Sequence, residues 1–110
     1  MSVKQKYIET FSPINTMKIR LNSQPNISKC SIKFFDGDIC VNSPSLLLSM
    51  QFFINGSDDN VNIKYENETN QYIISIDKDI SNSDILILSF KVSTENSFNN
   101  PMLKVQYSFN

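Results

Sequence analysis

Cys30-Ser-Ile-Lys-Phe-Phe-Asp-Gly-Asp-Ile-Cys-Val-Asn42 is the stretch that decides the fold of this chain. Apolar and polar residues alternate on both sides of Asp36-Gly37, as they do in two antiparallel strands that each bury one face. Asp-Gly accepts the positive φ values of a type I′ turn, which joins such strands into a tight hairpin. The resulting register pairs Phe34 with Ile39 on the apolar face.

The same period-two alternation recurs along most of the 110 residues. We expect about eight short strands. Outside the hairpin the segments are residues 4–11, 16–22, 45–54, 61–65, 71–77, 85–92 and 102–109. Turn-forming residues separate them about every 8–12 residues, which is typical of two-sheet folds. The sequence therefore predicts an all-β protein, a single β-sandwich of short antiparallel strands with a jelly-roll or immunoglobulin-like topology.

Residues 45–54 also fit a second interpretation. Ser43 followed by Pro44 is a good start for a short helix. Only a strand places all the alternating apolar residues of the segment on one side. These residues are Leu46, Leu48, Met50, Phe52 and Ile54. We therefore expect a strand.

The composition favours strands and one domain. The chain has no Ala, and it is rich in β-branched and aromatic residues. A chain of 110 residues suffices for one hydrophobic core. Pro13 ends the first strand, so we expect an N-terminal arm or edge strand over residues 1–15 and the sandwich domain over residues 16–110.

The charge pattern argues against two classes of partner. The net charge is −1, and the nine lysines and Arg20 are scattered among acidic residues without forming a block. We therefore expect neither a nucleic-acid partner nor a membrane partner. There is no long apolar run and no apolar signal region near the N-terminus. The sequence does not define a localisation; the pattern fits cytoplasmic synthesis with assembly into a virion or an extracellular filament.

No motif indicates catalysis or a cofactor. The chain lacks His, and no nucleophile motif or glycine-rich phosphate loop is present. Asp77, Asp79 and Asp84 imitate the start of a calcium loop. Leu88 stands where such a loop needs a bidentate Glu. We expect no enzyme and no bound metal, with these three aspartates as incomplete calcium candidates.

The two cysteines do not pair in the predicted hairpin. Cys40 lies opposite Lys33 and Cys30 opposite Ser43, too far apart along the ladder for a disulfide. Cys30 belongs to the core, whereas Cys40 faces outward beside Phe35.

Several predicted strands carry apolar residues on their outward faces. The candidates for an interface are Phe35, Cys40, Leu47, Phe53, Ile73, Ile85 and Ile87. Such residues indicate a second buried surface, unless some strand faces are wrongly assigned or loops cover the residues.

The leading hypothesis is a non-enzymatic structural protein that packs against copies of itself or another protein, as a phage virion component or a bacterial surface or spore filament subunit. One alternative is a carbohydrate-binding module with loop calcium. Another is a small phage- or plasmid-encoded inhibitor of a host protein.

Overall fold

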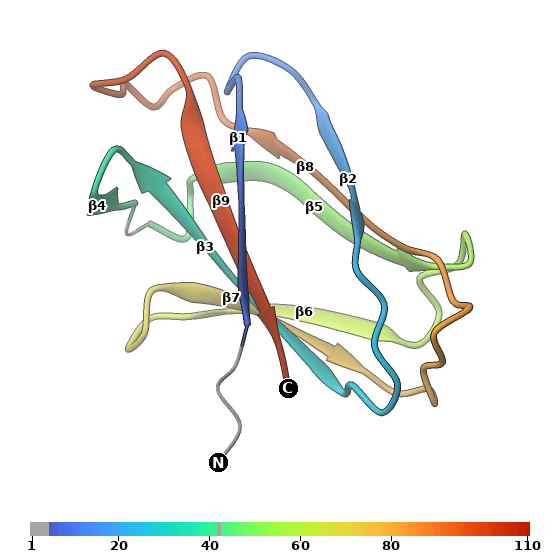
Figure 1. Cartoon of the computed structure of the whole chain (residues 1–110). Helices are drawn as coiled ribbons and strands as arrows, with labels where there is room; N and C mark the ends of the chain where they lie inside the picture. Colours follow the sequence, from blue (N-terminus) through green and yellow to red (C-terminus); the bar gives the residue numbers. More distant parts are fainter. Residues whose placement is uncertain (1–4, 42) are drawn as a thin grey trace.

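The computed structural model describes residues 5–41 and 43–110, and it places them in nine β-strands with no helix in these ranges. Figure 1 shows the strands gathered into two sheets. The larger sheet contains β1 (Lys6–Phe11), β3 (Lys29–Asp36), β4 (Ile39–Cys40), β6 (Val61–Glu66), β7 (Gln71–Ile76) and β9 (Leu103–Phe109). The smaller sheet contains β2 (Met17–Leu21), β5 (Leu47–Ile54) and β8 (Leu86–Val92). The predicted all-β sandwich is confirmed, and residues 45–54 supply a strand.

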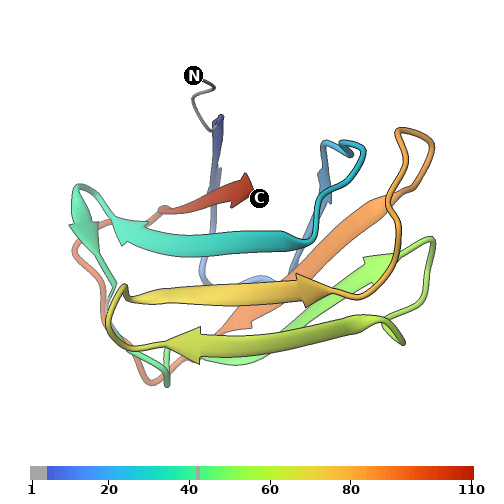
Figure 2. The same cartoon turned by 90° about the horizontal axis from the view of Figure 1, so that it is seen from below.

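The strand order resembles that of a jelly roll, except that β6 pairs with β7 in the larger sheet and does not join β5 in the smaller one. It is β1-β9-β3-β7-β6 along the larger sheet, with β4 beside β3, and β2-β8-β5 along the smaller one. The pairs are nested along the chain: β1 pairs with β9, β2 with β8 and β3 with β7, and β5 contacts β6. The chain is therefore one long hairpin that turns back between β5 and β6 and rolls into two sheets. Figure 2 shows β3, β7 and β6 side by side in one layer.

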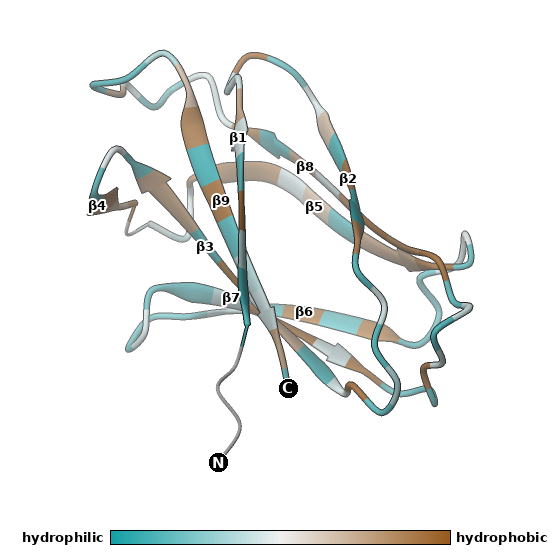
Figure 3. Ribbon diagram, in the orientation of Figure 1, coloured by the Kyte–Doolittle hydropathy of each residue, from teal (hydrophilic) through white to brown (hydrophobic). Residues whose placement is uncertain are grey.

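The core lies between the inward faces of the two sheets. The inward residues of β8 and β9 are the predicted ones: Leu86, Leu88, Phe90, Val92, Leu103, Val105, Tyr107 and Phe109. At its centre Phe90 meets Phe11 and Phe34 edge to face, with ring centroids 4.9 and 5.1 Å apart. Figure 3 shows apolar and polar residues alternating along β9. Because packing occupies the inward faces, a binding site must lie on an outer face or at an end.

The turn between β3 and β4 differs from the prediction. Asp36 pairs with Ile39, so Gly37 and Asp38 occupy the turn in place of Asp36-Gly37. Gly37 has a φ of 65°, which suits the glycine-first position of a type II′ turn. The register is shifted by two residues, so Phe35 and Cys40 stay on one face of the hairpin. Ile39, predicted to pair with Phe34 on the apolar face, pairs with Asp36 and is 64% exposed, so its predicted burial is wrong.

The side chain of Asp36 explains the shift. Its carboxylate accepts hydrogen bonds from the backbone N–H of Asn99 (2.7 Å) and Asn100 (3.1 Å), and from Nδ2 of Asn100 (2.7 Å). The residue is only 7% exposed. The Asn100 side-chain bond and the Asn99 backbone bond lower the pKa of Asp36. Asp36 therefore ties the β3–β4 hairpin to the loop before β9, a role that a turn residue would not fill.

A β-bulge interrupts β5. Leu47 lies opposite Val92, but Ser49 lies opposite Lys91, so Leu48 is an extra residue in this strand. Leu48 is 62% exposed, and its predicted inward position is therefore wrong. Beyond the bulge the predicted alternation holds.

The segment expected as an arm or edge strand contains β1, which pairs along its whole length with β9 at the edge of the larger sheet. Residues 1–4 of the predicted first strand, and Asn42 of the predicted hairpin, lie outside the described residues. Within the described ranges, no helix has the length and apolar character needed to span a membrane.

Candidate functional site

One continuous row of side chains crosses the outer face of the larger sheet. Lys6 on β1 pairs with Ser108 on β9, and Ser108 pairs with Ser31 on β3. Ser31 pairs with Ile73 on β7, and Ile73 pairs with Lys64 on β6. Paired residues on neighbouring strands point to the same face, about 4.8 Å apart per strand. The row therefore has long lysines at both ends and two short serines between them.

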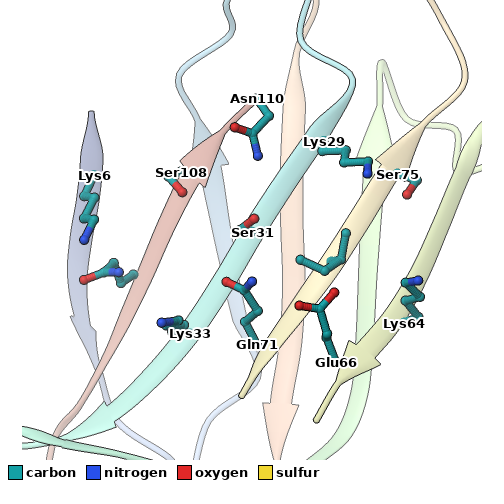
Figure 4. Close-up of a pocket in the computed structure, with 12 residues that line it drawn as sticks. Lys6, Lys29, Ser31, Lys33, Lys64, Glu66, Gln71, Ser75, Ser108 and Asn110 are labelled. Carbon is teal, nitrogen blue, oxygen red and sulfur yellow. The ribbon is translucent and has the colours of Figure 1, made fainter. Parts of the chain in front are cut away.

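An open groove of about 420 Å³ follows this row. Four lysines line it, Lys6, Lys29, Lys33 and Lys64, together with Glu66. Figure 4 shows Lys6 and Lys64 on the two outermost strands, with Ser31 between them on β3. Serine, glutamine and asparagine side chains supply most of the remaining lining. We call this surface the lysine groove.

The outer face of the larger sheet is strongly basic although the chain as a whole is not. Lys104 pairs with the outward Phe35, so it joins the four groove lysines on this face. Glu66 lies among them. The inference from the sequence that lysines form no block is wrong for the folded chain. The lysines are far apart in sequence, but each occupies an outward position on a neighbouring strand, and only the strand order reveals their proximity.

The interface candidates on the larger sheet fall into two groups. Phe35 and Cys40 pair across β3 and β4, and both are half-buried. Beside Phe35, a shallow hollow is lined by Ile8, which is 59% exposed. Ile73, in contrast, is only 8% exposed, although it lies in the lining of the lysine groove. Ile73 is therefore part of the packed sheet surface, and its predicted role as an exposed contact is not supported.

The candidates on the smaller sheet also divide. Phe53 and Ile87 pair on its outer face, where both are half-buried, and Ile85 is 42% exposed. Leu47 packs against the core next to the bulge. Leu47 is thus accounted for within the domain, whereas the other three remain on the surface.

The cysteine thiols are both free. Cys30 is fully buried, and this burial raises the pKa of its thiol to about 12. A thiol with so high a pKa is a poor nucleophile. Cys40 is half-buried, with its Sγ 3.9 Å from the backbone oxygen of Asn70. Cys40 therefore lies opposite Phe35, as an outward residue, and not opposite Lys33.

Two tyrosine hydroxyls on the inner side of the larger sheet are buried without a hydrogen-bond partner in the described part of the chain. They belong to Tyr65 and Tyr72, whose rings meet edge to face with centroids 4.9 Å apart. Burial raises the pKa of Tyr72 to about 12. Within the described part of the chain, no protein group replaces the hydrogen bonds with water that these hydroxyls lose on burial.

The calcium candidates do not converge. Within the described ranges, no group of three acidic, cysteine or histidine side chains is placed to hold a metal ion. Both carboxylate oxygens of Asp84 are already in use: Oδ1 accepts from Nδ2 of Asn55 (2.9 Å), and Oδ2 accepts from the N–H of Ser81 (2.9 Å). These bonds, the Ser81 backbone bond first, lower the pKa of Asp84. Asp84 therefore ties two loops together.

Comparison with known proteins adds no relative: no protein-family model, curated protein or solved structure matches the chain. Jelly rolls serve unrelated functions, among them capsid and lectin domains. Any function must therefore be argued from the lysine groove and the surfaces around it.

Proposed function

We propose that the protein is a non-enzymatic assembly domain that binds copies of itself or another protein through the outer face of its larger sheet. The observation that carries the proposal is the lysine groove, a concave basic surface built from five strands. A subunit of a virion, or of a bacterial surface or spore filament, is the setting that this proposal favours.

The chemistry of the groove supports binding rather than catalysis. Lysines, serines and amides surround Glu66, so the lining offers many hydrogen-bond donors and positive charges for an anionic partner. General acid–base catalysis on sugars commonly uses a pair of carboxylates, whereas Glu66 is the one carboxylate among the groove's described lining residues. The rigidity of a packed sheet also fits a preformed binding surface.

A carbohydrate-binding function is the second candidate, and the open polar groove is the observation that favours it. Hydroxyl and amide groups such as those of Ser31 and Gln71 hydrogen-bond readily to sugar hydroxyls. The lysines would select an acidic polysaccharide over a neutral one. Because the incomplete calcium candidates do not converge, this version needs no calcium ion.

Light scattering and sedimentation of the purified protein test the proposal. The protein is measured over a range of concentrations at low salt (about 50 mM NaCl) and at high salt (about 500 mM NaCl). We expect concentration-dependent association that weakens at the higher salt concentration, because screening reduces contacts made by lysines. A strict monomer that retains an acidic polysaccharide would replace the proposal by the second candidate. A strict monomer that binds neither would overturn both.

A further inference from the structure

The end of the sandwich formed by two loops is as acidic as the outer face of the larger sheet is basic. These are the β5–β6 loop, residues 55–60, and the β7–β8 loop, residues 77–85. They carry Asp58, Asp59, Asp77, Asp79 and Asp84, with Lys78 among them. All of these aspartates except Asp84 are exposed. We call this end of the molecule the acidic end.

Hydrogen bonds hold the two loops of the acidic end together. The N–H of Asp77 donates to the backbone oxygen of Asn60 (2.8 Å). Asn55 donates from Nδ2 to Asp84, and its Oδ1 accepts from the N–H of Ile85 (2.8 Å). Figure 1 shows the two loops next to each other at one end of the molecule. The exposed aspartates are therefore presented on a supported surface.

Two regions of opposite charge therefore stand out. Five lysines lie on the outer face of the larger sheet with Glu66, and with Asp38 beside Lys104. Five aspartates and one Lys lie at the acidic end, while the whole chain has a net charge of −1. A domain that binds an external polyanion gains from a net positive charge, which attracts the partner at long range. A nearly neutral chain with two opposite patches fits a contact between copies.

We infer that the acidic end of one copy docks in the lysine groove of the next, an inference that rests on the proposed assembly function. The two surfaces are different parts of the molecule, so the contact is head-to-tail. A head-to-tail contact leaves a free groove at one end of the pair and a free acidic end at the other. Each added copy therefore restores the same two free surfaces, and the assembly grows into a filament or closes into a ring.

Two charge-reversal variants test the inference. The groove variant carries Lys33→Glu and Lys64→Glu, and the acidic-end variant carries Asp59→Lys and Asp79→Lys. Asp84 is left intact because it ties the loops. We expect each variant alone to self-associate at least about tenfold more weakly than the wild type, since like charges then face each other. Circular dichroism melting curves verify that each variant folds.

Mixing the two variants provides the decisive measurement. The acidic-end variant keeps a normal groove, and the groove variant keeps a normal acidic end. One intact contact therefore forms between them. The reversed acidic end of one variant also complements the reversed groove of the other, so sedimentation of the mixture should show association that neither variant shows alone. A variant with all four substitutions should associate again, because its two patches are exchanged in sign.

A matched control reverses two charges elsewhere. Lys18→Glu with Arg20→Glu changes the same number of charges on β2 of the smaller sheet, and association should stay within about twofold of the wild type. If the groove variant loses association but the acidic-end variant does not, the inference is wrong while the assembly function stands. If neither variant loses association, both the inference and the role of the groove are wrong.

Discussion

The two sheets of this sandwich follow the same alternating pattern, yet their outer faces differ. In the larger sheet the central row contains Ser108, Ser31 and Ile73, and lysines stand at both ends. In the smaller sheet the corresponding position holds the paired apolar side chains Phe53 and Ile87. A groove forms where short side chains lie between long ones, whereas large side chains at the centre of a sheet leave no depression. The number of strands matters as well, because only the larger sheet has enough strands to place short side chains in the middle and lysines on both sides.

The largest expected difference between the two sheets concerns their outward isoleucines. Ile73→Ala should lower the free energy of unfolding by about 2 kcal/mol, because Ile73 is almost fully buried although it faces outward. Ile87→Ala on the smaller sheet should cost less than about 1 kcal/mol, since this residue is half-exposed. Urea unfolding of both variants measures the difference. Equal losses would mean that the two outer faces are packed alike.

The next effect concerns Asp36, a carboxylate that holds the larger sheet to the loop before β9. Asp36→Asn should destabilise the protein by less than Ile73→Ala does, because an amide group turned toward three N–H donors loses part of the hydrogen bonding. Asp38→Asn, in the adjacent turn and exposed, is the matched control and should change stability little. Thermal melting at neutral pH compares the two variants.

The same carboxylate predicts a pH dependence. The folded protein lowers the pKa of Asp36 below its ordinary value of 3.8. A lowered pKa stabilises the fold above the unfolded value, and this contribution is lost as pH falls through the folded pKa. The difference in free energy of unfolding between wild type and Asp36→Asn should therefore be largest at pH 7 and should decrease below about pH 4. A gap independent of pH from 7 to about 2 would contradict this role.

The smallest expected effect is an increase in the free energy of unfolding. Tyr72→Phe removes one of the unpartnered hydroxyls behind the larger sheet while keeping the ring against Tyr65 and Phe34. We expect stability to rise by about 0.5–1 kcal/mol, measured by urea unfolding. Tyr107→Phe is the control, since its hydroxyl is not among the unpartnered ones. A loss on Tyr72→Phe would indicate that its hydroxyl has a bound partner.

The sequence predicted the strands well because a strand that buries one face alternates apolar and polar residues, and this alternation is visible in a short stretch of sequence. β8 and β9 illustrate this, since all their inward residues were identified. Leu48 was misplaced because a bulge adds one residue without changing composition. The turn at Gly37 was misplaced because Asp36 binds Asn99 and Asn100, more than sixty residues away.

The lysine groove was not predictable in the same way. Its row joins residues 6, 31, 64, 73 and 108, and the order β1-β9-β3-β7-β6 that brings them together is a non-local property. A Lys-x-Ser-x-Lys pattern at Lys29–Lys33 was the one local sign of a polar outward face with a short residue at its centre. Outward apolar residues were a weaker guide, because Ile73 and Leu47 proved to be packed within the domain.

The position of β9 between β1 and β3 determines when the lysine groove forms during synthesis and folding. β9 follows the other eight strands along the chain, so it leaves the ribosome after them, and before it inserts, β1 and β3 have no strand between them. Pairing between strands so far apart in the sequence is also a slow step in folding. A nascent chain therefore has no groove to offer a neighbour. If copies join through the groove, we expect neighbouring nascent chains on one messenger RNA not to join before β9 of each has been made.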